Sequence, residues 1–570
     1  MPTCELAATG METGLLLPAA AIALVGIGLG SAALLSRRGK RRAALLGVVP
    51  VLVAGLVVTG APAPSFANAG PGCVAEAPGG GAGPVVPPAP PVPVFTAGAV
   101  GIGDPYFPLD GNGGYDVADY ALDLSYEPVT DELGGTATIT ATATQNLSAF
   151  NLDLDGLAVD SVLVNGQAAT FSLATTDISK VTGQPLVAGS GDALATPGRT
   201  ELTVVPAAGI PESTPFTVEV AYGGVPVTID DAYGLAGVFH TGDGALIVGQ
   251  PRVAATWFPA NDHPADKATL DVRMSVPDGL EVVGNGRLVG QESAGGRTTW
   301  EWRSDQPMAT YLATASIGEF DLTHVEQDGI EYWNAIDPAL YSIPAVDTDP
   351  TGPTVGENAE AVFGDEPEVI AFLSSVFGPF PFGQAGGIAD DEPRLEFALE
   401  NQTRPIYPAW AFEDADPYVV VHELAHQWYG DSVAMHRWSD IWLNEGFATY
   451  AEWLWTENEG GDDPATQAQG IYDGIPADDE FWTVEVADPG SANIFADATY
   501  YRGAMTLQAL RNTVGDATFF DIIEGWATEN AGGNVSTEQF VAYAEQVSGQ
   551  DLTALFDTWI YSTGKPAVAP

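Results

Sequence analysis

The chain has 570 residues, of which 46% are hydrophobic, so it can form two or three domains and is too apolar to be disordered. It carries 75 Asp and Glu against 19 Lys and Arg, a formal net charge of −56. Such a field repels nucleic acid and attracts cations or basic peptides, although a surface suited to solubility in salty surroundings is the simpler interpretation. The two cysteines, Cys4 and Cys73, precede the predicted folded region, so cysteine usage does not decide the compartment.

Residues 1–69 have the character of a targeting or membrane segment. An apolar stretch at 14–35 is long enough to span a bilayer, a basic cluster follows at 37–42, and a second apolar stretch at 43–60 leads to Ala-Asn-Ala at 67–69. The basic cluster, the second apolar stretch and the Ala-x-Ala end are together typical of a secretory signal peptide, with cleavage after residue 69. The alternative is a retained two-helix hairpin, with its basic loop in the cytoplasm. Both interpretations place the rest of the chain outside the cell, secreted or anchored at its surface.

Residues 70–103 are rich in Pro and Gly and are predicted to form a semi-rigid linker. From 104 to 322 the signals are those of strands, such as the alternation of Thr with Ala or Ile at 136–144. Asn-Gly pairs at 165–166 and 285–286 each lie between apolar runs, as the turns of β-hairpins do. We therefore expect an antiparallel β domain over this region.

In the region 323–565 the spacing of hydrophobic residues changes to that of helices. This region is predicted to be a mostly helical domain that contains the catalytic residues. The helices expected there cover 367–377, 418–430, 440–457, 502–513, 517–530 and 551–561. Ser536 and Gln539 form a capping box that begins a further helix. The predicted fold class is a multidomain α and β protein, with the β domain first.

The sequence His-Glu-Leu-Ala-His at 422–426 is an H-E-x-x-H motif. On a helix, His422 and His426 lie one turn apart on the same face and can bind one zinc ion. A third ligand is needed, with a fourth position left for water, and Glu445 at the start of the next predicted helix is the candidate. Glu423 is not a ligand and can take a proton from that water and pass it to the leaving amine. The alternative, two histidines that share a helix face by chance, is disfavoured because the chain has only six histidines.

Four segments together resemble the M1, or gluzincin, family of zinc aminopeptidases. The zinc motif continues as Gln-Trp-Tyr-Gly and is followed by Trp-Leu-Asn-Glu-Gly-Phe-Ala at 442–448. Phe-Ala-Leu-Glu-Asn at 397–401 stands where the family has G-A-M-E-N, and Tyr-Tyr-Arg-Gly at 500–503 is similar to its Y-E-K-G. Gln250, with Trp-Phe-Pro-Ala-Asn-Asp-His-Pro at 257–264, is similar to the substrate-edge segment of the family's β domain. The resemblance covers roughly residues 104–565.

This resemblance implies a thermolysin-like catalytic domain and a zinc aminopeptidase that hydrolyses the N-terminal peptide bond of peptides. One Zn²⁺ per chain is expected on His422, His426 and Glu445. The expected partners are peptides with a free N-terminus, and nucleic acid is not among them. We expect a monomer that contacts a membrane only through residues 1–69, if these are not cleaved.

The resemblance also assigns residues to the substrate. Glu400 is expected to bind the free α-ammonium by a charge-assisted hydrogen bond. Gln250 and Asn401 are expected to be further substrate contacts. Tyr500, rather than its neighbour Tyr501, is expected to donate a hydrogen bond to the oxyanion that forms on the scissile carbonyl.

The sequence also departs from the family pattern. Phe397 and Leu399 replace the Gly and Met of the G-A-M-E-N motif. The resemblance implies that these two side chains shape the pocket for the first side chain of the substrate, so the family does not fix the substrate preference. The chain stops about 120 residues after Glu445, which implies a short form without the large C-terminal helical domain and with a more open cleft. His436 and His263 are expected to be structural. Two alternatives stay open: an epoxide hydrolase, as in one branch of the family, and a non-catalytic surface binding protein, which predicts a damaged metal site.

Overall fold

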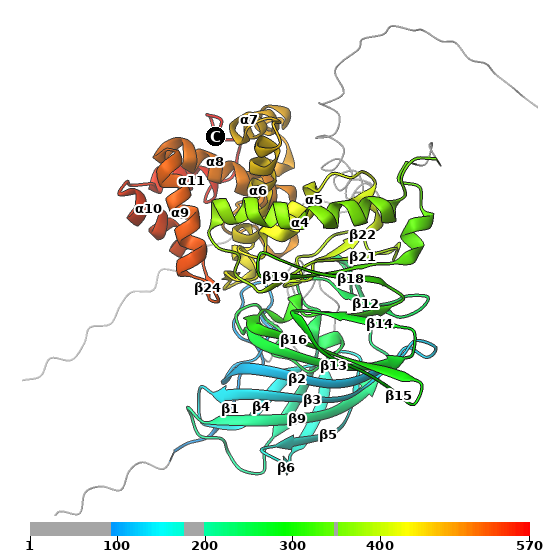
Figure 1. The fold of residues 1–570 in the computed structure, drawn as a ribbon. Coiled ribbons are helices and arrows are strands. Elements are labelled where there is room, and N and C mark those ends of the chain that lie inside the picture. Colours follow the sequence, from blue (N-terminus) through cyan, green and yellow to red (C-terminus); the bar gives the residue numbers. More distant parts are fainter. Residues whose placement is uncertain (1–92, 176–198, 347–350) are drawn as a thin grey trace, which may run out of the picture. The chain divides into compact units, whose positions relative to one another are not determined.

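The computed structural model describes residues 93–175, 199–346 and 351–570 (Figure 1). The predicted targeting segment, both cysteines and most of the predicted linker lie outside these ranges. Within them, no helix has the length and the apolar character that crossing a membrane requires.

An eight-stranded sheet is the largest element of the β domain, with the strand order β15-β16-β13-β2-β3-β9-β5-β6. Its strands are β2 (Tyr115–Glu127), β3 (Glu132–Ala143), β5 (Ala158–Val164), β6 (Gln167–Ala168), β9 (Pro215–Gly224), β13 (Ala268–Pro277), β15 (Arg287–Ala294) and β16 (Arg297–Met308). All neighbours pair antiparallel except β13 and β2, which are parallel. Buried and exposed residues alternate along β2 and β9, as expected for strands with one face on a core.

Two smaller sheets complete the β domain. The first has the order β1-β4-β8-β7 and the second β10-β11-β12-β17-β14. Their strands are β1 (Thr96–Ala97), β4 (Leu147–Asp153), β7 (Thr170–Thr175), β8 (Thr200–Val205), β10 (Thr228–Asp231), β11 (Gly234–His240), β12 (Ala245–Val248), β14 (Glu281–Gly284) and β17 (Ala315–Gly318). One hydrophobic core contains buried residues from all three sheets. Because β1 pairs with β4, the end of the predicted linker is part of the β domain.

The two Asn-Gly pairs have different outcomes. Asn165 and Gly166 connect the antiparallel strands β5 and β6, and both have the positive φ that a tight hairpin turn requires. The prediction of a second hairpin at Asn285 and Gly286 is wrong, because β14 and β15 on either side belong to different sheets. Asn285 is buried, and its side chain donates a hydrogen bond to the carbonyl of Leu312 (2.9 Å).

The catalytic domain begins with a sheet that the sequence did not predict. Its order is β18-β19-β21-β22, with β20 beside β19. The strands are β18 (Asp321–Gln327), β19 (Ile330–Ile336), β20 (Gln384–Ala385), β21 (Ile388–Asp390) and β22 (Ile406–Pro408), and a separate pair is formed by β23 (Ala434–Met435) and β24 (Asn534–Val535). The predicted domain boundary at 322–323 falls within β18. These strands are short and mostly parallel, so they lack the long alternation that marks a strand in sequence.

Eight α-helices follow among the described residues of this domain. They are α4 (Val355–Phe377), α5 (Tyr418–Ala425), α6 (Trp442–Asn458), α7 (Pro464–Gly474), α8 (Gly503–Val514), α9 (Asp516–Glu529), α10 (Thr537–Ser548) and α11 (Thr553–Trp559). The predicted capping box of α10 is confirmed, whereas α7 was not predicted. The helix expected at 367–377 begins earlier, because a capping box of Thr354 and Glu357 opens α4 and Pro367 lies inside it.

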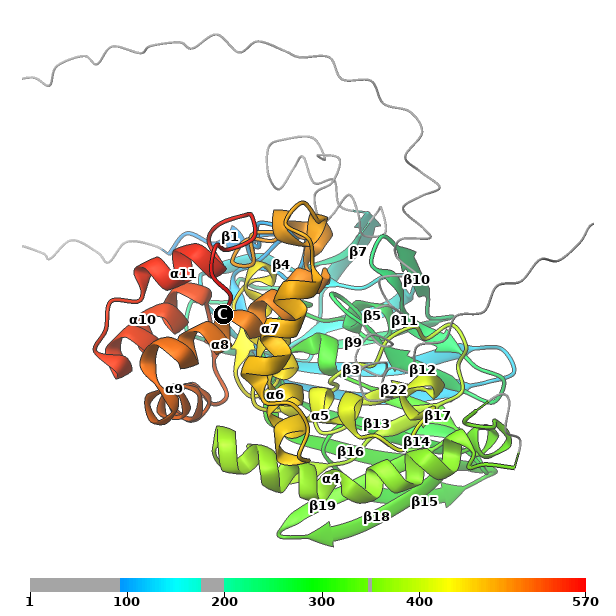
Figure 2. The ribbon, with the colours of Figure 1, turned by 90° about the horizontal axis from the view of Figure 1, so that it is seen from above.

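The helices α5 and α6 pack against each other and against α4, and α6 also packs against α8 (Figure 2). α5 ends at Ala425, five residues before the predicted end at 430, and His426 is its C-cap residue with helical dihedral angles. A single hydrophobic core holds both helices, including Leu424, Trp442 and Phe447. This packing places the end of α5 beside the first turn of α6.

Candidate active site

The three predicted metal ligands meet where α5 and α6 pack together. The Nε2 atoms of His422 and His426 each lie 3.4 Å from Oε2 of Glu445. One ligand atom from each residue lies within 4.8 Å of the others. Two imidazole nitrogens and one carboxylate oxygen that converge in this way are the donor set of a catalytic zinc site, which keeps one position open. The residues present therefore fit a zinc ion.

The other ring nitrogen of each histidine is engaged. Nδ1 of His422 lies 2.5 Å from Oε1 of Glu452, and Nδ1 of His426 lies 3.0 Å from the carbonyl oxygen of Tyr429. Since both partners are acceptors, each Nδ1 carries the proton, and Nε2 is left as the metal ligand. The sequence analysis did not identify Glu452. Its position seven residues after Glu445, two turns along α6 on the same face, could have indicated a role at the metal site.

Burial and charge shift the pKa values of the two glutamates in opposite directions. Burial raises the pKa of Glu423 to about 8, against the opposing effect of His422 and His426. Burial also acts to raise the pKa of Glu445, but His426 and His422 outweigh it and hold the value at about 2. Glu445 is thus an ionised ligand, whereas Glu423 can exchange a proton near neutral pH.

Glu400 lies next to this site and is almost fully buried. Its carboxylate, that of Glu423 and a ring nitrogen of His426 lie within 4.8 Å of one another. The Tyr311 hydroxyl donates a hydrogen bond to Oε1 of Glu400 (2.8 Å), and Gln427 Nε2 donates one to its main-chain carbonyl (3.3 Å). Burial raises the pKa of Glu400, and His426 opposes the shift. A carboxylate is therefore available beside the metal site, while its role as the amine ligand stays a prediction.

The other two predicted substrate contacts lie in different settings. Asn401 is fully buried and donates a hydrogen bond to the carbonyl of Leu312 (3.0 Å), while its Oδ1 atom has no hydrogen-bond partner among the described residues. Gln250 is half-buried, and its Oε1 atom is buried without a hydrogen-bond partner among the described residues. Burying a hydrogen-bond acceptor without a donor costs free energy. This cost is removed when a ligand donates a hydrogen bond to Oε1 of Gln250. Both roles stay predictions.

Tyr500 and Tyr501 lie in a π-helical turn, Ala498–Arg502, immediately before α8. The Tyr500 ring is nearly parallel to the ring of the ligand His422, with 6.2 Å between centroids. Tyr501 packs against the hydrophobic core of the catalytic domain instead. The geometry therefore agrees with the choice of Tyr500 for the oxyanion, and that role itself stays a prediction.

One expectation about the pocket for the first side chain is wrong. Leu399 is 0% exposed and lies in a small hydrophobic core with Ile406, with which it also exchanges two backbone hydrogen bonds. A side chain enclosed in this core does not line a substrate pocket. Phe397 is only partly buried against the same core, so it remains a candidate for the pocket.

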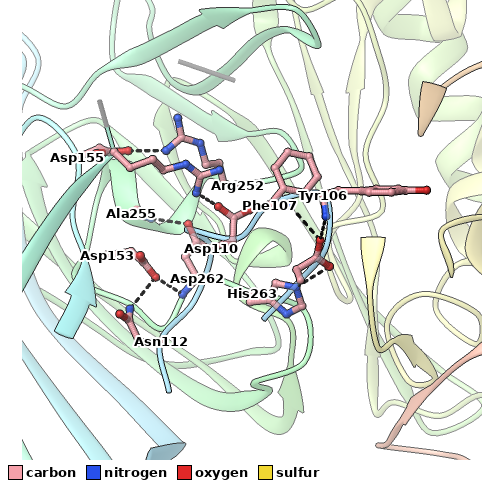
Figure 3. A network of polar contacts seen from close by, with 12 residues as sticks. Tyr106, Phe107, Asp110, Asn112, Asp153, Asp155, Arg252, Ala255, Asp262 and His263 are labelled. Atoms are coloured by element: carbon pink, nitrogen blue, oxygen red, sulfur yellow. Dashed lines mark hydrogen bonds and ion pairs between the residues drawn. The ribbon is translucent and has the colours of Figure 1, made fainter. Parts of the chain in front are cut away.

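The two histidines that were expected to be structural lie outside the groups of potential metal ligands among the described residues. His436 is exposed, and its main-chain N–H donates to the carbonyl of Val535. His263 is buried in the β domain, where Nε2 lies 3.2 Å from Oδ2 of Asp104 (Figure 3). Neither belongs to a group of potential metal ligands within the described part of the chain.

The fold and the site together define a class of protein. A helix with two histidine ligands, a glutamate ligand from the next helix and a preceding β domain describe a gluzincin-type zinc metallopeptidase. Two family models agree with this class: "Peptidase M1 N-terminal domain" matches residues 117–312, and "Peptidase family M1 domain" matches residues 413–559. Together they span more than half of the sequence. The chain belongs to peptidase family M1.

Similar proteins were found among curated sequences. Aminopeptidase M1-D of Oryza sativa subsp. japonica is 27% identical over 329 residues, which are 55% of this chain and 36% of that protein. Glutamyl aminopeptidase of Bos taurus is 27% identical over 334 residues, 56% of this chain and 34% of that protein. The matched region thus spans only about a third of the length of these relatives.

Solved structures match over a longer range. The crystal structure of an M1 zinc metallopeptidase from Deinococcus radiodurans is 26% identical, with a TM-score of 0.68, and the match covers 82% of this chain and 99% of that one. A mutant of that enzyme with a bound Tyr-Ser-Ala substrate matches equally well. A two-domain M1 zinc metallopeptidase mutant with bound L-arginine has a TM-score of 0.69.

Proposed function

We propose that the protein is a zinc-dependent aminopeptidase that releases the N-terminal residue of peptides. The observation that carries this proposal is the position of the Glu400 carboxylate, which lies within 4.8 Å of Glu423 and His426 ligand atoms. A carboxylate that binds the α-ammonium so close to the metal site allows only the first residue of a peptide to lie between them. An endopeptidase, which cuts within a chain, has no need of such a group.

Each residue of the site has a defined task in this reaction. His422, His426 and Glu445 would hold one zinc ion, which supplies Lewis-acid polarisation of the scissile carbonyl and lowers the pKa of water. Glu423 accepts a proton at its carboxylate from the attacking water and donates it to the departing amine. Glu452 holds the His422 ring in the tautomer that leaves Nε2 free.

The remaining groups orient the substrate. Glu400 accepts hydrogen bonds from the α-ammonium, and the unpaired Oε1 of Gln250 is a second acceptor for the same group. The Tyr500 hydroxyl donates to the oxyanion as the carbonyl becomes tetrahedral. The alternative of a non-catalytic binding protein predicted a damaged metal site. The proximity of the ligand atoms of His422, His426 and Glu445, within 4.8 Å of one another, supports the catalytic alternative instead.

The test is hydrolysis of a short peptide and its N-acetyl form by zinc-loaded protein, with products identified by mass spectrometry. The free peptide should lose its first residue, and the acetylated one should be cut far more slowly. In Glu400→Gln, kcat/KM for the free peptide should fall by roughly 30-fold or more, because a buried charge pair is lost. Equal rates on both peptides, or cleavage at internal bonds only, would overturn the proposal.

We further propose that the protein is exported and acts as a monomer with one zinc ion. Export is supported by the signal-like order of residues 1–69, and the metal count by the group of His422, His426 and Glu445, which alone among the described groups of potential ligands contains two histidines. Mass spectrometry of the mature N-terminus distinguishes cleavage after residue 69 from a retained membrane anchor. Metal analysis combined with light scattering measures the zinc content and the oligomeric state.

A further inference from the structure

A short turn of the β domain lies beside the segment that carries Glu400. This turn, η3 (Thr310–Leu312), is a 3₁₀ helix that places Tyr311 against the catalytic domain. The Tyr311 hydroxyl donates to Oε1 of Glu400 at 2.8 Å, and the two side chains lie in residues that are 1% and 2% exposed. In this enclosed setting the hydrogen bond does not compete with bulk water, so it can hold the carboxylate in one orientation.

The turn itself is anchored on its β-domain side. The Thr310 hydroxyl donates to Oδ1 of Asp262 (2.8 Å), and Oδ2 of Asp262 accepts from the main-chain N–H of Ala255 (3.0 Å). The main-chain N–H of Asp262 donates in turn to Asp153 (2.8 Å), within the buried polar network drawn in Figure 3. Each oxygen of the Asp262 carboxylate therefore has a donor, and Asp262 is a fixed support for the residue that precedes Tyr311.

A second set of contacts ties the turn to the segment of Glu400. The carbonyl of Leu312 accepts hydrogen bonds from Asn401 Nδ2 (3.0 Å) and Asn285 Nδ2 (2.9 Å). Asn285 also donates to the carbonyl of Gln402 (2.8 Å). Leu312, which follows Tyr311, is thus hydrogen-bonded to Asn401, which follows Glu400. This is a second link beside the one between the Tyr311 hydroxyl and the Glu400 carboxylate.

The Tyr311 ring is held from the catalytic domain. It lies at a tilt against the indole of Trp438, with 5.6 Å between ring centroids, and both residues belong to one hydrophobic core. With its ring packed and its turn anchored at both ends, Tyr311 has little freedom to move its hydroxyl away from Glu400. A glutamate side chain has three rotatable bonds and is flexible on its own. A fixed donor on one carboxylate oxygen restricts these rotations and so limits where the other oxygen points.

We propose that Tyr311 is a positioning residue for recognition of the substrate's N-terminus, and that it orients the Glu400 carboxylate toward the α-ammonium. This inference rests on the proposed aminopeptidase function and extends it. It assigns part of the selection of free N-termini to the β domain, through a residue that does not perform the chemistry. The chemical class selected is a peptide with an unmodified primary α-amine.

Binding in an inactive background tests this role without the complication of turnover. The variant Glu423→Gln, loaded with zinc, is titrated calorimetrically with Phe-Ala-Ala and with hydrocinnamoyl-Ala-Ala, which lacks only the α-amine. The Kd of hydrocinnamoyl-Ala-Ala divided by the Kd of Phe-Ala-Ala measures how strongly the α-amine contributes to binding. Adding Tyr311→Phe should reduce that ratio by about tenfold, the effect of losing a hydrogen bond to a charged group, and should leave the Kd of hydrocinnamoyl-Ala-Ala unchanged.

A matched control separates positioning from general stability. Tyr222 is also a buried tyrosine of the β domain, and its hydroxyl donates to the carbonyl of Trp257 (2.9 Å). Tyr222→Phe should lower the melting temperature but keep the Kd ratio of the background. If Tyr311→Phe does not fold, Thr310→Val takes its place, because it removes the anchor to Asp262 and keeps the Tyr311 hydroxyl; it should reduce the ratio in the same direction.

The outcomes distinguish a failure of the proposed aminopeptidase function from a failure of the positioning role of Tyr311. If the background variant binds both ligands equally, amine recognition is absent and the proposed function itself fails. If the background prefers the free amine and Tyr311→Phe, or Thr310→Val in its place, keeps the full preference, the positioning role is overturned. Equal weakening of both ligands contradicts the role as well, since it indicates a structural effect.

Discussion

The carboxylate of Glu452 accepts a hydrogen bond from Nδ1 of the predicted ligand His422 at 2.5 Å, so it holds the ring nitrogen that does not bind the metal. Glu452 and the ligand Glu445 project from the same face of α6, two turns apart. One helix therefore supplies both a metal ligand and the group that orients another ligand. This arrangement makes the zinc affinity depend on a residue that does not touch the metal.

Replacing Glu452 should weaken zinc binding. In Glu452→Gln the His422 ring loses its charged acceptor, and the zinc affinity should fall by about 10–100-fold. Competition with a chelator of known affinity measures the change. Glu457→Gln, on the exposed part of the same helix, is the control and should bind zinc as the unmodified protein does. An unchanged affinity in Glu452→Gln would show that the contact does not hold the ligand.

Replacing Glu423 should remove turnover without removing the metal. Glu423→Gln keeps the size of the side chain but cannot accept a proton, so kcat should fall by about 10²–10⁴-fold. Metal analysis should still find zinc, whereas His426→Ala should lose both zinc and activity. Removal of zinc with a chelator should abolish hydrolysis, and adding zinc back should restore it. Full activity in Glu423→Gln would refute its role as the base.

The two neighbouring tyrosines offer a matched comparison. Tyr500→Phe removes the hydroxyl proposed to meet the oxyanion, so kcat should fall by about 10²–10³-fold with little change in KM. Tyr501→Phe changes a side chain that packs against the core, and it should alter kcat by much less. Steady-state kinetics on one peptide decides between them. A larger loss in Tyr501→Phe would reassign the role.

A buried glutamate that is not one of the potential metal ligands among the described residues should make stability depend on pH. Glu366 is fully buried, and burial raises its pKa to about 8, although Asn334 and Arg404 favour the charged form. The folded protein therefore binds a proton that the unfolded chain, with the ordinary pKa of 4.5, releases first. The free energy of unfolding should fall as the pH rises from about 4.5 to about 8, by at most about 1.4 kcal/mol per pH unit from this group.

The variant Glu366→Gln isolates this contribution. Glutamine retains an acceptor for the amide of Asn334, which donates to Oε2 at 2.9 Å, but it does not titrate. Urea unfolding at both ends of the pH window should show a smaller decline of the unfolding free energy in the variant than in the unmodified protein. An identical decline in both would mean that Glu366 is ionised in the folded state.

Local patterns in the sequence determined the metal site and several helix ends. His422 and His426 share a face because one turn of α-helix separates them, and Glu445 opens the next helix, so neither feature needs knowledge of the rest of the fold. The capping box at Ser536 and the hairpin at Asn165 are equally local. Family membership followed from the same short motifs.

Long-range contacts decided what short patterns do not contain. Asn285 looked like a hairpin turn, but its amide is buried between Leu312 and Gln402, far along the chain. Leu399 occupies a motif position expected at the pocket, yet its side chain lies in a core built from several strands. The sheet of β18–β22 was also missed, because strands of two to seven residues carry too little periodicity.

The sequence by itself determined the chemistry, namely two histidines and a glutamate for zinc with Glu423 beside them. Only the tertiary structure decided how the β domain takes part. Tyr311 and Glu400 are separated by many residues, and no local period links them. They meet because η3, held by Asp262 and Asn401, packs against the catalytic domain. Packing between domains depends on the shape of both surfaces, which is a property of the folded chain and not of any short stretch of sequence.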